Sequence, residues 1–267
     1  MVSAGTPVYT FGYGSCKGGG YSWSQSELDD ALTSDVGAFV RDDKGTQECL
    51  DIFTNGATTN FSMDMLKSLF NVDDNVIKDW QVGEGIACAY LHNHRSCDIP
   101  WNNQRDLRTP SGSLPGVDIC GIRTDNGSDQ LFVCEVKTSA EQAYPPQVAS
   151  ANPHHGGLAA QVKDLRDNEL VQRTIIRYLV CRAKEEPWRT RVRCAVGRYL
   201  TNNSDIGIYG FMVRDVAPDK KDLEKRVKDV SADTNGTDIE FLALYLPLGK
   251  IATLATSIRR TGGGVVC

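Results

Sequence analysis

The chain of 267 residues lacks a long uninterrupted run of apolar residues, so it offers no candidate for a membrane-spanning helix. Its first residues, MVSAGTPVYTFGYGS, lack the basic and apolar regions of a secretory signal peptide. We therefore expect a cytoplasmic protein with no membrane partner. Since 40% of the residues are hydrophobic, the chain has enough apolar material to build one sizeable core.

Several chemical signatures are missing as well. None of the nine cysteines forms a C-x-x-C pair, and the four histidines do not complete a zinc spacing, so no structural zinc site is expected. The phosphate-loop pattern G-x-x-x-x-G-K-[ST] and the G-x-S-x-G turn of serine hydrolases are also absent. The glycine-rich residues 11–22 are therefore interpreted as a flexible segment or a turn.

The net charge of −5 is unevenly distributed along the chain. Residues 151–200 hold 10 Lys and Arg against 5 Asp and Glu, whereas residues 1–150 hold 10 against 20. A local basic stripe of this kind can bind phosphates, and it is equally compatible with an ordinary solvated surface. The acidic total argues against strong binding of nucleic acid by this chain alone.

Apolar periodicity predicts an α/β or α+β fold, in which helices flank a mixed sheet. We expect a helix over residues 74–94, broken at Gly83 or Gly85, and over residues 158–183 either two helices or one helix with a bend near Asn168. Further predictions are strands over 193–200, 207–213 and 239–248, and a closing helix over 249–260. Residues 1–74 are expected to be a helical or irregular region packed on a core of residues 75–267.

Two apolar segments at the centre of the chain predict a β-hairpin. Residues 117–122 (VDICGI) and 131–139 (LFVCEVKTS) are joined across Asn126-Gly127, the strongest short hairpin signal. Strand side chains alternate between faces, so Glu135 and Lys137 point the same way, and Asp118 lies on the paired neighbour. Charges in so apolar a strand need a reason, because burying an unpaired charge is costly.

These residue types suit a hard divalent cation such as Mg²⁺ or Mn²⁺. Asp118 and Glu135 on adjacent strands can clamp one ion, and the Val136 carbonyl can add a third ligand. Such an ion polarises a phosphoryl oxygen and helps to deprotonate water. Lys137 can orient the attacking water or stabilise the developing charge. The alternative is a buried Glu135–Lys137 salt bridge, with Asp118 as a turn residue.

The pattern resembles the PD-(D/E)XK nuclease superfamily, which has the restriction-endonuclease-like fold. The matching residues are Pro115, Asp118, Glu135 and Lys137, with one departure, since the acid comes three residues after the proline. The resemblance implies a metal-dependent DNA endonuclease with Mg²⁺ or Mn²⁺ as cofactor. It also implies two further site residues, Glu84 on the helix before the hairpin and Gln161 on the helix after it. Without the resemblance, Glu84 is an ordinary acid near a helix start.

A narrower resemblance is to subunits of the HamA type, the nuclease-like component of Hachiman anti-phage defence. It rests on the LPGVD turn, the E-x-K strand, the long helix and the late strand ending in YLPL. It implies an effector in a bacterial defence complex, with DNA as substrate and a HamB-like helicase as partner. Two alternatives stay open, a non-catalytic module that binds nucleic acid or a helicase, and another metal-dependent phosphodiesterase or RNase.

Overall fold

The computed structural model describes residues 1–54, 59–70, 77–106, 116–149, 156–232, 234 and 236–262. Among them, the strands form one seven-stranded sheet in the order β1-β2-β7-β6-β5-β4-β3. The strands are β1 (Thr6–Tyr13), β2 (Cys16–Ser22), β3 (Cys97–Asp98), β4 (Ile119–Asp125), β5 (Ser128–Ser139), β6 (Ile206–Arg214) and β7 (Asp238–Tyr245).

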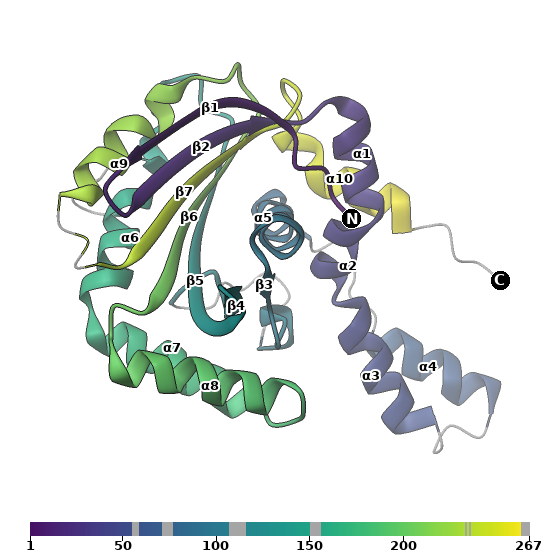
Figure 1. The fold of residues 1–267 in the computed structure, drawn as a ribbon. Coiled ribbons are helices and arrows are strands. Elements are labelled where there is room, and N and C mark those ends of the chain that lie inside the picture. The colour runs from purple at the N-terminus through teal and green to yellow at the C-terminus, as the bar shows by residue number, and fades with distance from the viewer. Residues whose placement is uncertain are drawn as a thin grey trace.

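Helices cover both faces of this sheet (Figure 1). Figure 1 shows α5 on the concave face and α6 to α9 on the opposite side. The helices are α1 (Gln25–Thr33), α2 (Asp35–Arg41), α3 (Asp43–Thr54), α4 (Asn60–Phe70), α5 (Asp79–Arg95), α6 (Leu158–Asp167), α7 (Glu169–Arg182), α8 (Trp188–Thr201), α9 (Glu224–Ser231) and α10 (Leu254–Gly262). The predicted mixed sheet flanked by helices is confirmed.

The sheet combines both strand directions. Strands β2, β7, β6 and β5 run parallel to one another, whereas β1 pairs antiparallel with β2, β4 with β5, and β3 with β4. The predicted hairpin of β4 and β5 is present, and its turn has Asn126 and Gly127 at φ 47° and 76°. Positive φ at both central residues matches the twist of the flanking strands.

Alternation along β5 divides its side chains between two hydrophobic cores. Phe132 and Cys134 belong to the core beneath α5, whereas Leu131 and Val133 belong to the core beneath α6. Both cores use strand β5 because it lies inside the sheet and helices cover each of its faces. The parity of the strand places Glu135 and Lys137 on the α6 side.

Helix α5 is continuous, so the predicted break at Gly83 or Gly85 is wrong. Both glycines are buried, and each allows a close approach to a neighbouring element. A Cβ on Gly83 would collide with Thr138 Oγ1 of β5, and one on Gly85 would lie 2.6 Å from Val40 Cγ2 of α2. The glycines therefore serve packing within the helix and do not end it.

Two predictions of local structure are wrong. Residues 11–22 are not a flexible segment, because they form the end of β1 and all of β2, and residues 6–22 belong to the same sheet as the core. Gly18 faces Phe11, whose ring would collide with any Cβ there. Residues 193–200 belong to α8, in which Val192, Ala195 and Tyr199 are buried at helical spacing.

Other predictions of local structure are confirmed. Asn168 separates α6 from α7, and its side chain accepts a hydrogen bond from the Val171 amide. Strands β6 and β7 and the closing helix α10 occur where they were expected. In the described ranges, no helix is both long enough and apolar enough to cross a membrane.

Some predictions fall outside the described residues. Pro115 of the resemblance lies there, as does the boundary between residues 74 and 75 that was expected to separate an N-terminal region from the core. That division of the chain stays a prediction.

The contact at Gly83 makes a testable prediction. Gly83→Ala should lower the free energy of unfolding by about 1–3 kcal/mol, because the added methyl group overpacks the contact with Thr138. The measurement is urea unfolding. Gly197→Ala is the matched control, since a Cβ there meets nothing within 4 Å, and it should be neutral or stabilising. Equal effects of both changes would contradict the packing role of Gly83.

Candidate active site

The candidate site lies where β5 extends beyond its partner β4. The two strands pair only as far as Ile119 opposite Cys134, whereas β5 continues to Ser139 with β6 as its neighbour. Asp118 directly precedes β4, and its Oδ2 accepts a hydrogen bond of 2.7 Å from the Val136 amide. A carboxylate thus takes the place that a strand carbonyl would otherwise fill.

Glu135 and Lys137 lie on the same side of this part of β5, as the alternation of the strand predicts. Lys137 Nζ is 2.7 Å from Glu135 Oε1. The Glu135 side chain is only 5% exposed, whereas that of Lys137 is 23% exposed. The salt bridge proposed as the structural alternative is therefore present. Lys137 keeps a partial path to solvent, so it can also reach a molecule in the site.

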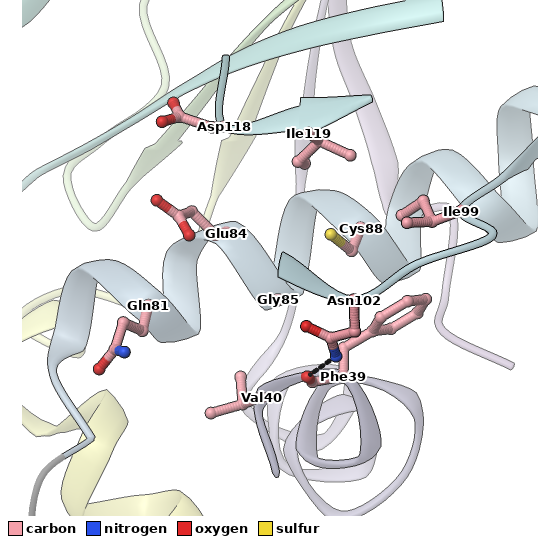
Figure 2. Close-up of a pocket in the computed structure, with 10 residues that line it drawn as sticks. All are labelled: Phe39, Val40, Gln81, Glu84, Gly85, Cys88, Ile99, Asn102, Asp118 and Ile119. Atoms are coloured by element: carbon pink, nitrogen blue, oxygen red, sulfur yellow. Dashed lines mark hydrogen bonds between the residues drawn. The ribbon is translucent and has the colours of Figure 1, made fainter. Parts of the chain in front are cut away.

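Glu84 reaches the same region from the other side of the sheet. It lies on α5, and Figure 2 shows its carboxyl group directed toward Asp118 across a small pocket. The pocket has a volume of about 40 Å³ and is also lined by Cys88 and Ile119. A space of this size holds a water molecule or a small ion. The approach of α5 at Gly83 sets the depth at which Glu84 lies.

Burial and neighbouring carboxylates disfavour the ionised forms of Glu84 and Glu135. Burial, followed by the charges of Asp118 and Glu135, raises the pKa of Glu84 to about 8. Burial and then the charge of Asp118 raise the pKa of Glu135 to about 7, although Lys137 opposes this. Burial also raises the pKa of Asp118. The Glu135 and Asp118 carboxyl groups share a hydrogen bond, which requires a proton on one of them.

Gln161 lies on α6, the helix that covers the face toward which Glu135 and Lys137 point. Its Oε1 is buried and has no hydrogen-bond partner among the described residues. An unsatisfied buried acceptor costs about 1–3 kcal/mol, so this oxygen is suited to a donor that enters with a ligand. The described residues show no hydrogen bond between Gln161 and Glu135, so the structure does not join Gln161 to the carboxylate group.

The donor chemistry of the site fits a hard divalent cation, because carboxylate oxygens are its preferred ligands. The present arrangement is not a complete set of metal ligands. In the described part of the chain, no three His, Cys, Asp or Glu side chains are placed to hold a metal ion. An ion at Glu135 would have to displace Lys137 and the shared proton. Val136 contacts Asp118 through its amide, and the predicted role of its carbonyl stays a prediction.

Two residues near the site could not be found from the sequence. Phe39 of α2 and Asn102 line the pocket, and Asn102 Nδ2 donates a hydrogen bond of 2.7 Å to the Phe39 carbonyl. They come from segments far apart in the chain and carry no motif. Cys88, by contrast, lies one helical turn after Glu84, and that spacing already placed it on the same side.

No protein-family model matches this chain, and no curated protein matches its sequence.

The raised pKa of Glu84 predicts how stability depends on pH. The folded state binds this proton more tightly than the unfolded state, so wild-type stability should fall between about pH 5 and pH 8. Glu84→Gln should remove part of that fall. Allowing for solvent screening, the free energy of unfolding of Glu84→Gln should exceed that of the wild type by about 1–2 kcal/mol at pH 8 and by much less at pH 5.

The measurement is urea unfolding at both pH values in the presence of a chelator. Glu169→Gln on α7 is the matched control, because its side chain is 58% exposed. A Glu84→Gln effect that is the same at both pH values would contradict the assigned pKa.

Proposed function

We propose that this protein is a metal-dependent nuclease that hydrolyses phosphodiester bonds, with DNA as the expected substrate. The observation that carries the proposal is the convergence of Glu84, Asp118 and Glu135 at the free end of β5, with Lys137 as their nearest cation. Burial, followed by the charges of neighbouring carboxylates that Lys137 only partly offsets, raises the pKa of Glu84 to about 8 and that of Glu135 to about 7. A divalent cation would supply the missing positive charge.

Each residue has a role in this proposal. Asp118 and Glu135 offer carboxylate oxygens to the cation, which when bound polarises a phosphoryl oxygen and acidifies water. Glu84, with a pKa of about 8, can exchange a proton with water near neutral pH. Lys137, once released from Glu135, can orient the attacking water or bind the phosphoryl oxygens. The free Oε1 of Gln161 can accept a hydrogen bond from a water molecule.

A non-catalytic binding module is the second candidate. The 2.7 Å contact between Lys137 and Glu135 favours it, because the pair is already satisfied without a metal ion. The same contact is compatible with the nuclease proposal, since a buried ion pair can open when a stronger cation enters. An RNase or another phosphodiesterase would use the same residues. The defence complex and the helicase partner rest on the sequence resemblance alone and stay predictions.

Cleavage of DNA tests the proposed function directly. Plasmid and linear DNA should be cut in the presence of Mg²⁺ or Mn²⁺, and Glu135→Gln or Lys137→Met should lower the rate by about a hundredfold or more. The assay compares initial rates for the protein alone and with a helicase encoded beside it.

Glu169→Gln makes the same chemical change as Glu135→Gln on an exposed side chain, so it should retain the wild-type rate. Cleavage that survives both site substitutions would come from a contaminant or another site. RNA cleaved in preference to DNA would move the assignment to an RNase.

Metal binding can be measured without any substrate. Mn²⁺ at about a hundred times its dissociation constant should stabilise the wild type by about 2.7 kcal/mol. Binding must displace the protons of Glu84 and Glu135, so the gain in thermal stability should be larger at pH 8 than at pH 6. Glu135→Gln should abolish it and Glu169→Gln should keep it. An equal shift in all three proteins would place the ion elsewhere.

A further inference from the structure

A groove of about 810 Å³ opens beside the candidate active site. Its walls are α2 and the start of α3, the segment from Ile99 to Arg105, and the turn between α7 and α8. It shares Phe39, Ile99 and Asn102 with the small pocket that holds Glu84 and Asp118. The two spaces are therefore neighbours with a common wall, and a molecule in the groove lies next to the small pocket.

Two of the four tryptophans of the chain line this groove. Trp101 is held by its Nε1, which donates a hydrogen bond of 3.0 Å to Asp106 Oδ2, and the Arg105 guanidinium lies 4.9 Å from its ring centre. Trp188, at the start of α8, has the Arg191 guanidinium 5.2 Å from its ring centre. The Arg182 guanidinium also lies 5.8 Å from the Trp101 ring centre. Aromatic rings and guanidinium planes are the groups on which unpaired bases stack.

Several charged side chains that line the groove form ion pairs with other residues of the chain. Arg105 binds Asp42 and Glu48, and Asp98 lies 2.8 Å from Arg191. Lys44 and Lys184 add positive charge at exposed positions, although Lys44 also lies 3.8 Å from Glu48 and the exposed Glu185 and Glu186 add negative charge beside Lys184. A groove of this composition can contact few phosphates, so most of its binding energy must come from stacking.

We propose that this groove binds the unpaired bases of a single-stranded nucleic acid and leads the strand to the carboxylate site. The inference rests on the proposed function and narrows its substrate to single-stranded DNA or an unpaired end. The volume lies in the range of small-molecule pockets, which fits a few nucleotides and is too small for a duplex. A peptide is the competing occupant, and it is the weaker choice because the adjacent carboxylate site is proposed to act on phosphodiester bonds.

Binding in the presence of a chelator tests the groove without any catalysis. The probe is a short fluorescent single-stranded DNA, compared by anisotropy with a blunt duplex of the same sequence. The single strand should bind at least about tenfold more tightly. Two phosphate contacts, one each from Lys44 and Lys184, give a slope of log affinity against log salt of about −1.4. Preference for the duplex, or a much steeper slope, would overturn the proposal.

Substitution of the tryptophans gives the second arm. Trp101→Leu and Trp188→Leu should each weaken the single strand by about tenfold. Trp80→Leu is the matched control, because Trp80 is 37% exposed and lies outside the groove lining, and it should bind as the wild type does. Equal affinities in all four proteins would overturn the proposal.

Photo-crosslinking keeps the test valid if a tryptophan variant fails to fold. A single strand that carries a photoreactive pyrimidine is irradiated with the wild-type protein, and the attached peptide is identified by mass spectrometry. Attachment within residues 99–106 or 182–191 supports the groove. Attachment only on the outer face of α7 and α8, for example at Arg177 or Arg193, would contradict it.

These results separate the groove from the catalytic site. Glu135→Gln should abolish cleavage and leave the affinity for single-stranded DNA within about twofold of the wild type, as the stacking surfaces stay intact. Single-strand binding that depends on the tryptophans, without any cleavage, would support the groove and refute the nuclease. Cleavage at a rate that neither Trp101→Leu nor Trp188→Leu changes would support the nuclease and refute the groove.

Discussion

The pairing of β4 with β5 ends one residue before Glu135, and the candidate site depends on that early ending. The Val136 amide of β5 donates a hydrogen bond to the side chain of Asp118, so a carboxylate takes the place of a further β4 partner at this point. Glu84 belongs to the helix on one face and Glu135 points to the other, yet the charge of Glu135 contributes to the raised pKa of Glu84. It can do so because no further β4 residue separates the two faces there.

Charge balance sets this region apart from the rest of the interior. Elsewhere in the described structure, half-buried acids lie against arginines, for example Glu240 at 2.8 Å from Arg95 and Asp106 at 2.6 Å from Arg182, and one arginine can serve two acids, as Arg191 serves Asp98 and Asp129. At the end of β5 one lysine serves three carboxyl groups. A local departure from the rule that buried charges are paired is what functional sites characteristically show. The cost falls on stability, since each carboxyl group must stay protonated or repel its neighbours.

Much of this site follows from short-range patterns in the sequence. Alternation in β5 and the Asn126-Gly127 turn were enough to place Asp118, Glu135 and Lys137 together, because strand register is fixed locally by a tight turn. Glu84 and Gln161 came from the resemblance, and the structure brings Glu84 to the carboxylates but does not connect Gln161 to them. The groove could not be predicted, since its walls come from segments joined only by tertiary packing.

The wrong predictions have equally local causes. The apolar residues Cys194, Ala195, Val196, Tyr199 and Leu200 imitate a buried strand, but the buried residues of α8 are spaced by three and four. Strand β2 was not predicted because it contains three consecutive glycines, and glycine has a low intrinsic preference for strands. That strand forms through its neighbours: the aromatic rings of β1 lie over the glycines on one side, and β7 pairs with it on the other.

The position of β2 has a consequence for the order in which the molecule assembles. Cys16 pairs with Ile239, so β2 cannot pair with β7 until more than two hundred further residues have been synthesised. At about 5–20 residues per second, the ribosome needs at least about ten seconds to supply it. During that time an exposed strand edge is a hazard for aggregation. Three glycines in a row make this early segment a poor template for mispairing, so the feature that weakens the strand also protects the unfinished chain.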